Sequence, residues 1–419
     1  MGGGPAEAAG SLEEQLTALT RGVVDLHQRE DLERLLRAKK RLRVKAGFDP
    51  TRPDLHLGHT VVMEKLRQFQ AWGHEVVFLV GDFTAMVGDP TGKNEARPRL
   101  TAEEVQAAAA TYTHQAFKIL DRAETSVRFN SEWLGALGAP DIVSLGAKYT
   151  VARMLERDDF ARRYADGRPI HIHEFLYPLL QGYDSVTLAC DVEVGGTDQL
   201  FNLMVGRDLM PRYETPPQVV MTMPLLVGTD ARVVDGDVTG QKMSKSNDNY
   251  IGIDEPPFEM LQKLMLVDDQ VLWHYMELLS HRSAAEIDAV REETTGSPEG
   301  IVAAKEAFAR EVVVRFHDET AFDEALARRR RVSAGGVPDD VEETTLDADA
   351  EGGRLGLAKA LRLAGLTAST GEAFRLLKQG GVYLDGARVQ DEKTHLVRGQ
   401  RVLVRLGSKK KRFRYLTVR

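Results

Sequence analysis

Two histidines, His56 and His59, stand three residues apart in the segment GFDPTRPDLHLGH, residues 47–59. The segment joins a strand expected over 41–48 to a helix expected over 59–72, and the free amides at a helix N-terminus can hold an anion. Side chains three apart on a helix face the same way, and Gly58 between them lets a large group approach the backbone. The spacing is compatible with an anion site. Solvated histidines in a turn are the alternative, and a zinc site would need ligands that no nearby cluster supplies.

A second glycine-rich segment, GDPTGK at 88–93, fails the pattern of a phosphate-binding P-loop. Only three residues separate Gly88 from Gly92 where four are required, and Asn94 stands where Ser or Thr would bind Mg²⁺. The segment follows a strand expected over 75–80. It therefore predicts either an ordinary turn or a ligand-binding loop at the carboxyl end of a strand.

Two lysines, Lys242 and Lys245, lie in the segment KMSKS, residues 242–246, shortly after the glycine-flanked stretch 235–240. Two ammonium groups on such a loop can form a mobile clamp for an anion. The alternative is an exposed basic turn. The five-residue string is more specific than a run of charges, and it stands where an α/β region meets a helical one.

The elements around these motifs indicate an α/β fold. Strand 41–48, helix 59–72 and strand 75–80 form the unit of a doubly wound parallel sheet. Helices are also expected over 11–40, over 101–120 with a capping box of Thr101 and Glu104, and over most of 139–166; 219–223 is expected as a buried strand. The chain is expected to divide into an N-terminal extension and helix, an α/β domain that carries the motifs, a helical domain, an acidic glycine-rich linker and a basic module, with the bounds 1–31, 32–250, 251–331, 332–353 and 354–419.

Charge is distributed unevenly along the 419 residues. The net charge is −8, but residues 354–419 hold sixteen Lys/Arg against four Asp/Glu, a net of +12, which leaves −20 for the other 353 residues. A basic module on an acidic body points to a polyanionic partner for one end only.

Composition also indicates the cellular compartment in which the protein works. A single cysteine, Cys190, cannot form an internal disulfide or a multi-thiolate zinc site, and the first residues lack the charge and apolar run of a secretory signal. Apolar runs such as 76–80 are too short to cross a bilayer. We therefore expect a cytoplasmic protein that does not engage a membrane.

Together these motifs resemble the class I aminoacyl-tRNA synthetases. HLGH at 56–59 is similar to their first signature, and KMSKS at 242–246 is their second. YPLLQGYD at 177–184 and GGTDQ at 195–199 resemble the amino-acid-binding segments of the tyrosyl-tRNA synthetases, above all the bacterial subgroup with Lys at position 45 and GDFT at 81–84. Strings in 361–386 resemble a small RNA-binding domain shared with a ribosomal protein. The resemblance implies a Rossmann-like sheet, a helical anticodon-binding domain over 251–331 and a small α+β RNA-binding domain at the end.

The resemblance also implies roles for individual residues. Asp184 would accept the phenol proton of tyrosine, or else be a buried structural carboxylate; Tyr177, Gln181 and Asp89 would hold the ammonium group. The adenosine and α-phosphate region would be lined by Gly47, Asp49, Gly58, Gly196, Asp198 and Gln199. The phosphates of ATP would be contacted by Thr51, His56 and His59. The pyrophosphate would be bound by Lys242 and Lys245. Lys93 and Arg97 would add positive charge to the same region. Lys45 departs from the better-known subgroup, which has Tyr there, and could pair with Asp184 or receive the phenol oxygen.

The implied activity is tyrosine–tRNA ligation. L-Tyrosine and ATP, entering as Mg-ATP, would give tyrosyl-adenylate and pyrophosphate, and the 2′- or 3′-hydroxyl of the terminal adenosine of tRNA(Tyr) would then take the tyrosine. No prosthetic group or structural metal is expected, and relatives form homodimers through the segment that 139–166 matches. The alternative interpretations of the sequence are three: a tryptophanyl enzyme of the same fold, a non-catalytic RNA-binding paralogue, and a nucleotide-binding enzyme that does not use tRNA.

Overall fold

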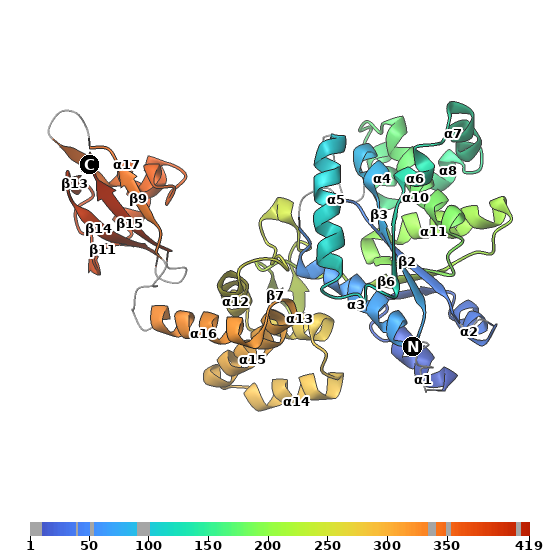
Figure 1. Ribbon diagram of the computed structural model, residues 1–419, viewed down its shortest axis with the longest axis horizontal. Coiled ribbons are helices and arrows are strands. Elements are labelled where there is room, and N and C mark those ends of the chain that lie inside the picture. Colours follow the sequence, from blue (N-terminus) through green and yellow to red (C-terminus); the bar gives the residue numbers. More distant parts are fainter. Residues whose placement is uncertain are drawn as a thin grey trace, which may run out of the picture. The chain divides into compact units, whose positions relative to one another are not determined.

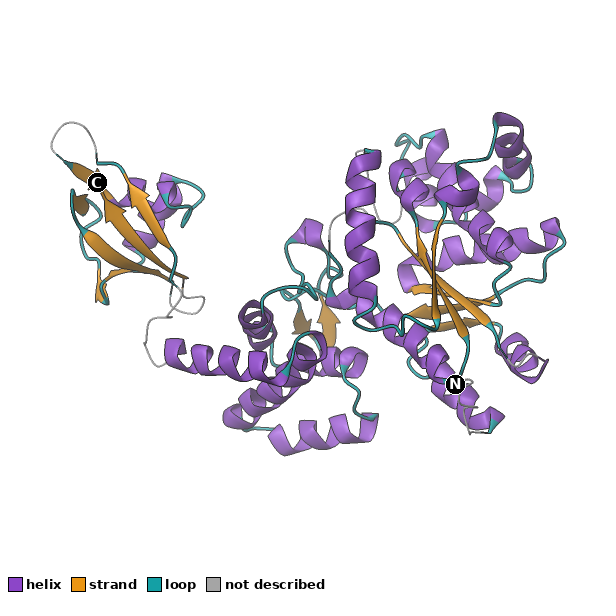
Figure 2. Cartoon of the chain, in the orientation of Figure 1, coloured by secondary structure: helices purple, strands orange, loops and turns teal. Residues whose placement is uncertain are grey.

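The computed structural model describes residues 11–38, 41–50, 54–89, 101–333, 341–348, 353–407 and 412–419. The chain divides into two compact units, Met1–Phe322 and Asp323–Arg419. Figure 1 names their helices and strands, and Figure 2 shows that each unit contains its own sheet.

A six-stranded sheet forms the centre of the first unit. Five strands are parallel, and the short first strand pairs antiparallel with β6 at one edge. Across the sheet the order is β1 (Asp25–His27), β6 (Val219–Met223), β5 (Val192–Gly196), β2 (Arg43–Phe48), β3 (Glu75–Val80) and β4 (Thr125–Phe129). This is the order of a Rossmann-like sheet, and it reverses between β2 and β5. The α/β, doubly wound prediction is confirmed.

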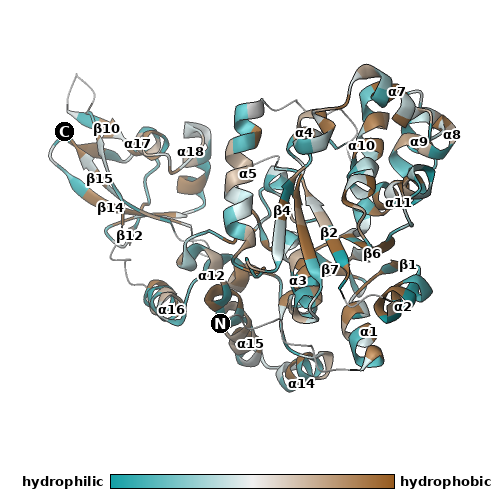
Figure 3. Cartoon of the chain, turned by 45° about the vertical axis from the view of Figure 1, so that its right-hand side comes forward, coloured by the Kyte–Doolittle hydropathy of each residue, from teal (hydrophilic) through white to brown (hydrophobic). Residues whose placement is uncertain are grey.

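The two faces of the sheet follow from strand alternation. On β3, Val77 and Leu79 pack into a buried apolar cluster with α10 (Ile172–Leu188) and α11 (Leu200–Leu209). Phe78 faces the other way, where it stacks on Phe48 beside α3 (Leu57–Ala71). Figure 3 shows hydrophobic residues concentrated along these central strands. Burial on both faces explains why the strands read as continuous apolar runs.

Helices complete the first unit. The capping box of Thr101 and Glu104 is present, the three helices within 139–166 confirm the helical prediction, and 254–330 contains no strand. A short hairpin, β7 (Arg232–Val234) with β8 (Asp237–Thr239), precedes the KMSKS segment. The remaining helices of this unit are α1 (Leu12–Thr20), α2 (Arg29–Ala38), α4 (Asp82–Val87), α5 (Ala102–Ala116), α6 (Ser131–Leu134), α7 (Ala139–Gly146), α8 (Val151–Met154), α9 (Asp158–Ala165), α12 (Pro257–Leu266), α13 (Val271–Leu279), α14 (Ala284–Thr294) and α15 (Pro298–Phe316). Helix α16 (Glu319–Ser333) begins in the first unit and continues into the second.

The purely helical expectation for 11–40 is wrong in one place, because β1 lies within it and joins the sheet. The segment is anchored by Lys65 of α3, whose buried ammonium donates to the carbonyls of Leu19 and Arg21 and to Gln68 Oε1 at 2.7–3.0 Å. Residues 25–27 therefore belong to the α/β domain rather than to an extension before it. Three residues carry too little periodicity to reveal a strand, and pairing with β6 decides the structure.

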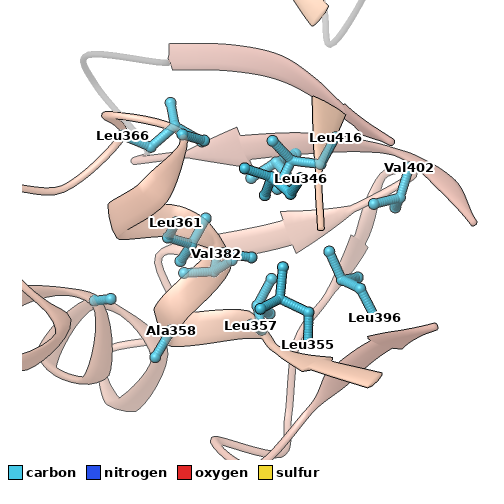
Figure 4. Close-up of a cluster of buried hydrophobic side chains, with 14 of the residues drawn as sticks. Leu346, Leu355, Leu357, Ala358, Leu361, Leu366, Val382, Leu396, Val402 and Leu416 are labelled. Atoms are coloured by element: carbon cyan, nitrogen blue, oxygen red, sulfur yellow. The ribbon is translucent and has the colours of Figure 1, made fainter. Parts of the chain in front are cut away.

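The second unit is a small α+β domain. Its five-stranded sheet has the order β12 (Ala387–Arg388), β11 (Val382–Leu384), β14 (Arg401–Leu406), β15 (Arg412–Val418) and β9 (Glu343–Leu346), and β10 (Arg354–Gly356) pairs with β13 (His395–Val397). Side chains from the strands and from α17 (Leu357–Leu363) and α18 (Thr370–Lys378) form one core, shown in Figure 4.

The expected linker over 332–353 is wrong for 343–346. That stretch is β9, which pairs parallel with β15 and buries Leu346 in the core. The acidic residues that suggested a solvated linker form ion pairs with β14 and β15, such as Glu343 with Arg401. None of the described helices is long and apolar enough to cross a membrane.

Candidate active site

A cavity of about 890 Å³ opens at the carboxyl ends of the central strands, beside the point where the strand order reverses. This is where open α/β sheets bind ligands. Fifteen of the candidate residues line it together: Lys45, Gly47, Asp49, His56, Gly58, His59, Asp89, Tyr177, Gln181, Asp184, Gly196, Asp198, Gln199, Lys242 and Lys245. Thr51, Lys93 and Arg97 lie outside the described residues.

The inner end of the cavity holds a buried carboxylate, Asp184, of which 2% is exposed. Trp133 Nε1 donates to its Oδ1 at 2.8 Å and Asn130 Nδ2 to its Oδ2 at 3.2 Å. Burial raises the pKa of Asp184 to about 7, against the opposing effects of Lys45 and the two donors. The group is therefore poised between neutral and charged near physiological pH.

Lys45 and Glu193 face each other across the reversal point. They are directly paired in the register of β2 and β5, both are buried, and Nζ lies 3.1 Å from Oε1. Burial acts to lower the pKa of Lys45, but Glu193, Cys190 and Asp184 outweigh it, so the pKa is raised and the ammonium stays charged. The cavity thus has a fixed positive charge next to Asp184.

A second set of oxygens lies along α10 and the loops that face it. Tyr177 donates its hydroxyl to Asp49 Oδ2 at 2.8 Å, which leaves the Tyr177 oxygen able to accept. Asp89 Oδ2 accepts from Gln199 Nε2 at 3.0 Å. Gln181 Oε1 is buried without a hydrogen-bond donor among the described residues. Tyr177, Gln181 and Asp184 are four and three residues apart, so α10 presents all three to the cavity. Acceptors grouped in this way suit a cation such as an α-ammonium group.

The two histidines are held in one tautomer by backbone amides. Gly58 N donates to His56 Nδ1 at 3.2 Å, and His56 N donates to His59 Nδ1 at 3.1 Å. A backbone N–H can only donate, so both Nδ1 atoms are acceptors and each neutral ring carries its proton on Nε2. Burial lowers the pKa of both, to about 3 for His59. The site therefore offers two neutral N–H donors. A Cβ on Gly58 would lie 3.0 Å from the His56 ring, so the glycine makes room for it.

The KMSKS segment closes the outer side of the cavity. Met243 is buried and its amide donates to Leu226 O at 2.8 Å; Ser244 N donates to Asn249 Oδ1 at 2.8 Å. With the segment anchored in this way, Lys242 Nζ donates to Asp198 and Lys245 Nζ to the backbone carbonyl of Asp54. Both lysine side chains are long, and a polyphosphate in the cavity would offer them charge-assisted hydrogen bonds in place of these.

Three residues at the inner end were missed by sequence reasoning. Asn130 follows directly on β4, and Trp133 lies in the short helix α6 after it; an interpretation of 125–129 as a strand would have pointed to both. Glu193 is a charged residue between two buried valines, itself a signal in a buried strand. No three His, Cys, Asp or Glu side chains gather as metal ligands within the described part of the chain.

Known proteins are similar to this chain over most of its length. The family model described as tRNA synthetases class I (W and Y) matches residues 37–331. Proteins named tyrosine–tRNA ligase from Thiobacillus denitrificans and Nitrosomonas europaea are each 50% identical to this chain; the alignments cover 95% and 96% of this chain and 98% and 95% of theirs.

Solved structures agree on the fold. A C-terminally truncated mitochondrial tyrosyl-tRNA synthetase of Aspergillus nidulans matches with a TM-score of 0.62 at 25% identity, over 77% of this chain and 94% of that one. Tyrosyl-tRNA synthetase of Archaeoglobus fulgidus, complexed with L-tyrosine, matches with a TM-score of 0.59 at 23% identity, over 74% and 99%.

The histidine geometry makes a prediction that needs no substrate. We expect His56 and His59 to show Nε2-protonated ring ¹⁵N shifts that do not titrate between pH 5 and pH 8, because burial disfavours the charged form. Two-dimensional ¹⁵N–¹H NMR of histidine-labelled protein measures this. Titration of either cavity histidine near pH 6.5 would contradict the assignment.

Proposed function

The chain belongs to the class I tryptophanyl and tyrosyl-tRNA synthetases, and we propose that it works as the tyrosine–tRNA ligase of that family. It activates L-tyrosine with ATP to tyrosyl-adenylate and transfers the tyrosine to the terminal adenosine of tRNA(Tyr). The observation that carries this within the site is the buried Asp184, with Trp133 and Asn130 as donors, at the inner end of the cavity. A hydroxyl-reading site of this kind rejects phenylalanine because its own polar group would be left unpaired, a rule for which tyrosyl-tRNA synthetases are the standard example.

Tyrosine would enter with its phenol toward Asp184. Its ammonium group would lie among the oxygens of Tyr177, Gln181 and Asp89, which supports the roles expected for these three. Asp49 is bonded to the Tyr177 hydroxyl, so it orients this end of the amino acid besides bordering the nucleotide region. The tyrosine carboxylate is thereby left facing the wider part of the cavity.

ATP would occupy that wider part. The cavity there is lined by Gly47, Gly58, Gly196, Asp198 and Gln199, which would surround the nucleoside and the α-phosphate. The Nε2–H groups of His56 and His59 would donate to the phosphates, and Lys242 and Lys245 would exchange their protein oxygens for those of the leaving pyrophosphate. Mg²⁺ enters with the nucleotide as part of the substrate.

Two displacements complete the reaction. The tyrosine carboxylate attacks the α-phosphorus in line, and pyrophosphate leaves; a ribose hydroxyl of the tRNA then attacks the acyl carbon, and AMP leaves. No protein nucleophile is required. The side chains act by position and by stabilising the charge that develops on phosphate.

The second unit supports binding of tRNA. Arg362 on α17 and Arg375 and Lys378 on α18 are exposed and pair with no acidic residue among those described, and Leu363 and Phe374 are exposed beside them. Cations with interspersed apolar side chains suit a folded RNA. We assign the helices within 251–331 to the anticodon region of the same tRNA.

An exposed apolar surface supports the homodimer. Val143, Val151, Tyr164 and Ile172, from α7 to the start of α10, are 72%, 61%, 70% and 75% exposed. A group of large apolar side chains this exposed marks a protein interface. We place the reaction in the cytoplasm, where the single thiol, the buried Cys190, stays reduced.

The direct test of the function is aminoacylation. Purified protein should transfer radiolabelled tyrosine, but not phenylalanine or tryptophan, to a bacterial tRNA(Tyr) transcript in the presence of Mg-ATP. A folded protein that binds this tRNA yet charges it with no amino acid would favour the RNA-binding paralogue instead.

Asp184 predicts a pH dependence of tyrosine binding. Its pKa of about 7 in the empty cavity means that it is protonated below that pH, where it cannot accept the phenol proton as a carboxylate. We expect KM for tyrosine in ATP–pyrophosphate exchange to be about tenfold higher at pH 6 than at pH 8. Asp184→Asn should abolish this dependence. A flat KM in the wild-type protein over this range would refute the proposed state of Asp184.

Lys245 should act on the chemical step. We expect Lys245→Ala to slow adenylate formation by about 10²–10³-fold and to leave tyrosine affinity nearly unchanged, because it removes a donor to the departing pyrophosphate. Stopped-flow fluorescence separates the two quantities. Equal losses in rate and in tyrosine affinity would remove Lys245 from this role.

Removal of the part of the second unit that follows Ser333, with its whole sheet, should separate the two steps. A chain that ends at Ser333 omits β9 together with the rest of its sheet. A cut near 350 would instead leave β9 without β15, the strand with which it pairs. We expect this truncation to retain tyrosine-dependent ATP–pyrophosphate exchange and to lose at least about 100-fold in tRNA charging, because phosphate contacts are lost. Full charging by the truncated protein would contradict a tRNA-binding role for the unit.

The exposed apolar surface predicts the oligomeric state. The wild-type protein should sediment as a dimer of about 93 kDa, twice the chain mass of 46.5 kDa. Val143→Asp should dissociate it, while the matched change of an exposed valine on α15, Val302→Asp, should not. A Val143→Asp protein that sediments as the wild type does would place the interface elsewhere.

A further inference from the structure

The side-chain amide of Gln115 joins three segments of the chain behind the wall of the cavity. Gln115 lies at the carboxyl end of α5 and is fully buried. Its Oε1 accepts a hydrogen bond from Leu55 N, and its Nε2 donates to Asp54 Oδ1 at 2.8 Å and to Asp254 Oδ2. A backbone N–H can only donate and an ionised carboxylate can only accept. All three partners therefore require the same orientation of the amide.

Two of these partners belong to the loop that leads into α3, residues 54–56. Asp54 has a φ of +71°, in the left-handed region that residues other than glycine seldom adopt. Such a backbone persists only where the surrounding structure holds it, and Gln115 bonds both to the Asp54 side chain and to the next amide. The carbonyl of Asp54 is the acceptor for Lys245 Nζ. Gln115 therefore fixes the atom that holds a lysine of the KMSKS segment.

The third partner belongs to the segment that follows KMSKS, which lies against the same loop. His56 and Gly252 pair there in an antiparallel bridge, and backbone hydrogen bonds of 2.9 and 3.0 Å flank the pair. Asp254 follows two residues later, where Gln115 donates to its carboxylate and Lys118 of α5 forms an ion pair with it. Helix α5 therefore holds the segments before HLGH and after KMSKS against each other.

Helix α5 also contacts the histidines of the cavity. Tyr112, one turn before Gln115, lies edge-on to His59 with the ring centroids 6.2 Å apart, and both rings line the cavity. Gln115 itself does not line it. A buried side chain outside the cavity can act on the reaction only through the groups that it positions. That effect can be large, because a misplacement of about 1 Å can cost about 100-fold in rate.

We propose that Gln115 is a positioning residue for adenylate formation, which holds the HLGH segment and Lys245 in the relative positions that the chemical step requires. This rests on the proposed function and deepens it. Without the amide, the loop before α3 is free to leave its left-handed conformation, and the donors to the phosphates lose their alignment. Tyrosine binds at the other end of the cavity, so its affinity does not depend on Gln115.

Gln115→Leu tests the proposal, because it replaces the amide by an apolar side chain of similar size. We expect kcat for tyrosine-dependent ATP–pyrophosphate exchange to fall about 10- to 100-fold and KM for tyrosine to stay within about twofold of the wild-type value. A loss of fold alone would lower the amount of active protein without changing which step is slow. A folded Gln115→Leu protein whose kcat is within about twofold of wild type would overturn the proposal.

Gln70→Leu is the matched control. Gln70 is a glutamine near the carboxyl end of α3, the end away from HLGH, and its amide also bridges two segments. It donates to Asp121 O at 3.2 Å and to Thr125 Oγ1 at 2.7 Å, and it accepts from Asp121 N at 3.1 Å. It does not line the cavity. The change should leave kcat within about twofold of wild type. A loss equal to that of Gln115→Leu would overturn the proposal, because any bridging amide would then have the same effect.

Reversal of the hydrogen bonds gives a rescue that does not leave the partners unpaired. Gln115→Glu alone places a third carboxylate beside Asp54 and Asp254, so we expect it to be slow. Combined with Asp54→Asn and Asp254→Asn, the new carboxylate accepts where the amide donated, and asparagine tolerates a left-handed backbone. The triple variant should recover at least about fivefold in kcat over Gln115→Glu, as coupled residues do. A triple variant no faster than Gln115→Glu would contradict the role of these bonds.

Histidine ring NMR gives a signature that does not depend on activity. The His56 amide that donates to His59 Nδ1 belongs to the loop that Gln115 holds. We expect the ring ¹⁵N resonances of both histidines to shift in Gln115→Leu and to coincide with those of the wild type in Gln70→Leu. Unchanged ring resonances in Gln115→Leu would overturn the proposal.

The outcomes separate this inference from the function beneath it. If the wild-type protein shows no tyrosine-dependent exchange, the proposed function fails. If it exchanges with tyrosine and Gln115→Leu exchanges as fast, only the role of Gln115 fails.

Discussion

The pairing of β2 with β5 is the constraint on which the site depends. These two strands meet where the strand order reverses, and their register sets Lys45 opposite Glu193 on the face that α10 and α11 cover. A slip of one residue between the two strands would leave Lys45 and Glu193 on opposite faces of the sheet and break their ion pair, since the side-chain period of a strand is two. The positions of Lys45 and Glu193 in the cavity are therefore fixed by the geometry of the sheet.

The outer half of the site is built on a different principle. Here the backbone orients the functional groups: amides at the start of α3 fix the tautomers of His56 and His59, and the hydrogen bond that Ser244 N donates to Asn249 Oδ1 holds the KMSKS segment in place. The inner part of the cavity, with Lys45, Glu193 and Asp184, is buried, which suits recognition of a side chain. The outer half is more exposed, with the Lys242 side chain 48% exposed, and this suits the pyrophosphate-binding role that we propose for it.

The sequence predicted the parts of the molecule that are encoded locally. HLGH and KMSKS are short strings whose chemistry can be stated from residue type and spacing, and the continuous apolar run at 76–80 reveals β3 directly. Tyr177 and Asp184 could be placed on one helix face by counting residues. Each of these inferences needed only neighbours along the chain.

What could not be predicted depends on pairing between distant segments. Asp184 receives its hydrogen bonds from Trp133 and Asn130, about fifty residues earlier, and nothing in the local pattern joins them. β1 and β9 were missed for the same reason, because a three-residue strand and an acidic EETTL become strands only through β6 and β15. Long-range pairing overrides weak local propensity at these positions.

The central claim is that this cavity selects an amino acid by its phenolic hydroxyl before activating it. ATP–pyrophosphate exchange, run separately with each of the twenty amino acids, tests it most directly. We expect exchange with tyrosine alone. Exchange driven by tryptophan or by phenylalanine at a comparable rate would contradict the claim, because neither side chain presents a hydroxyl to Asp184.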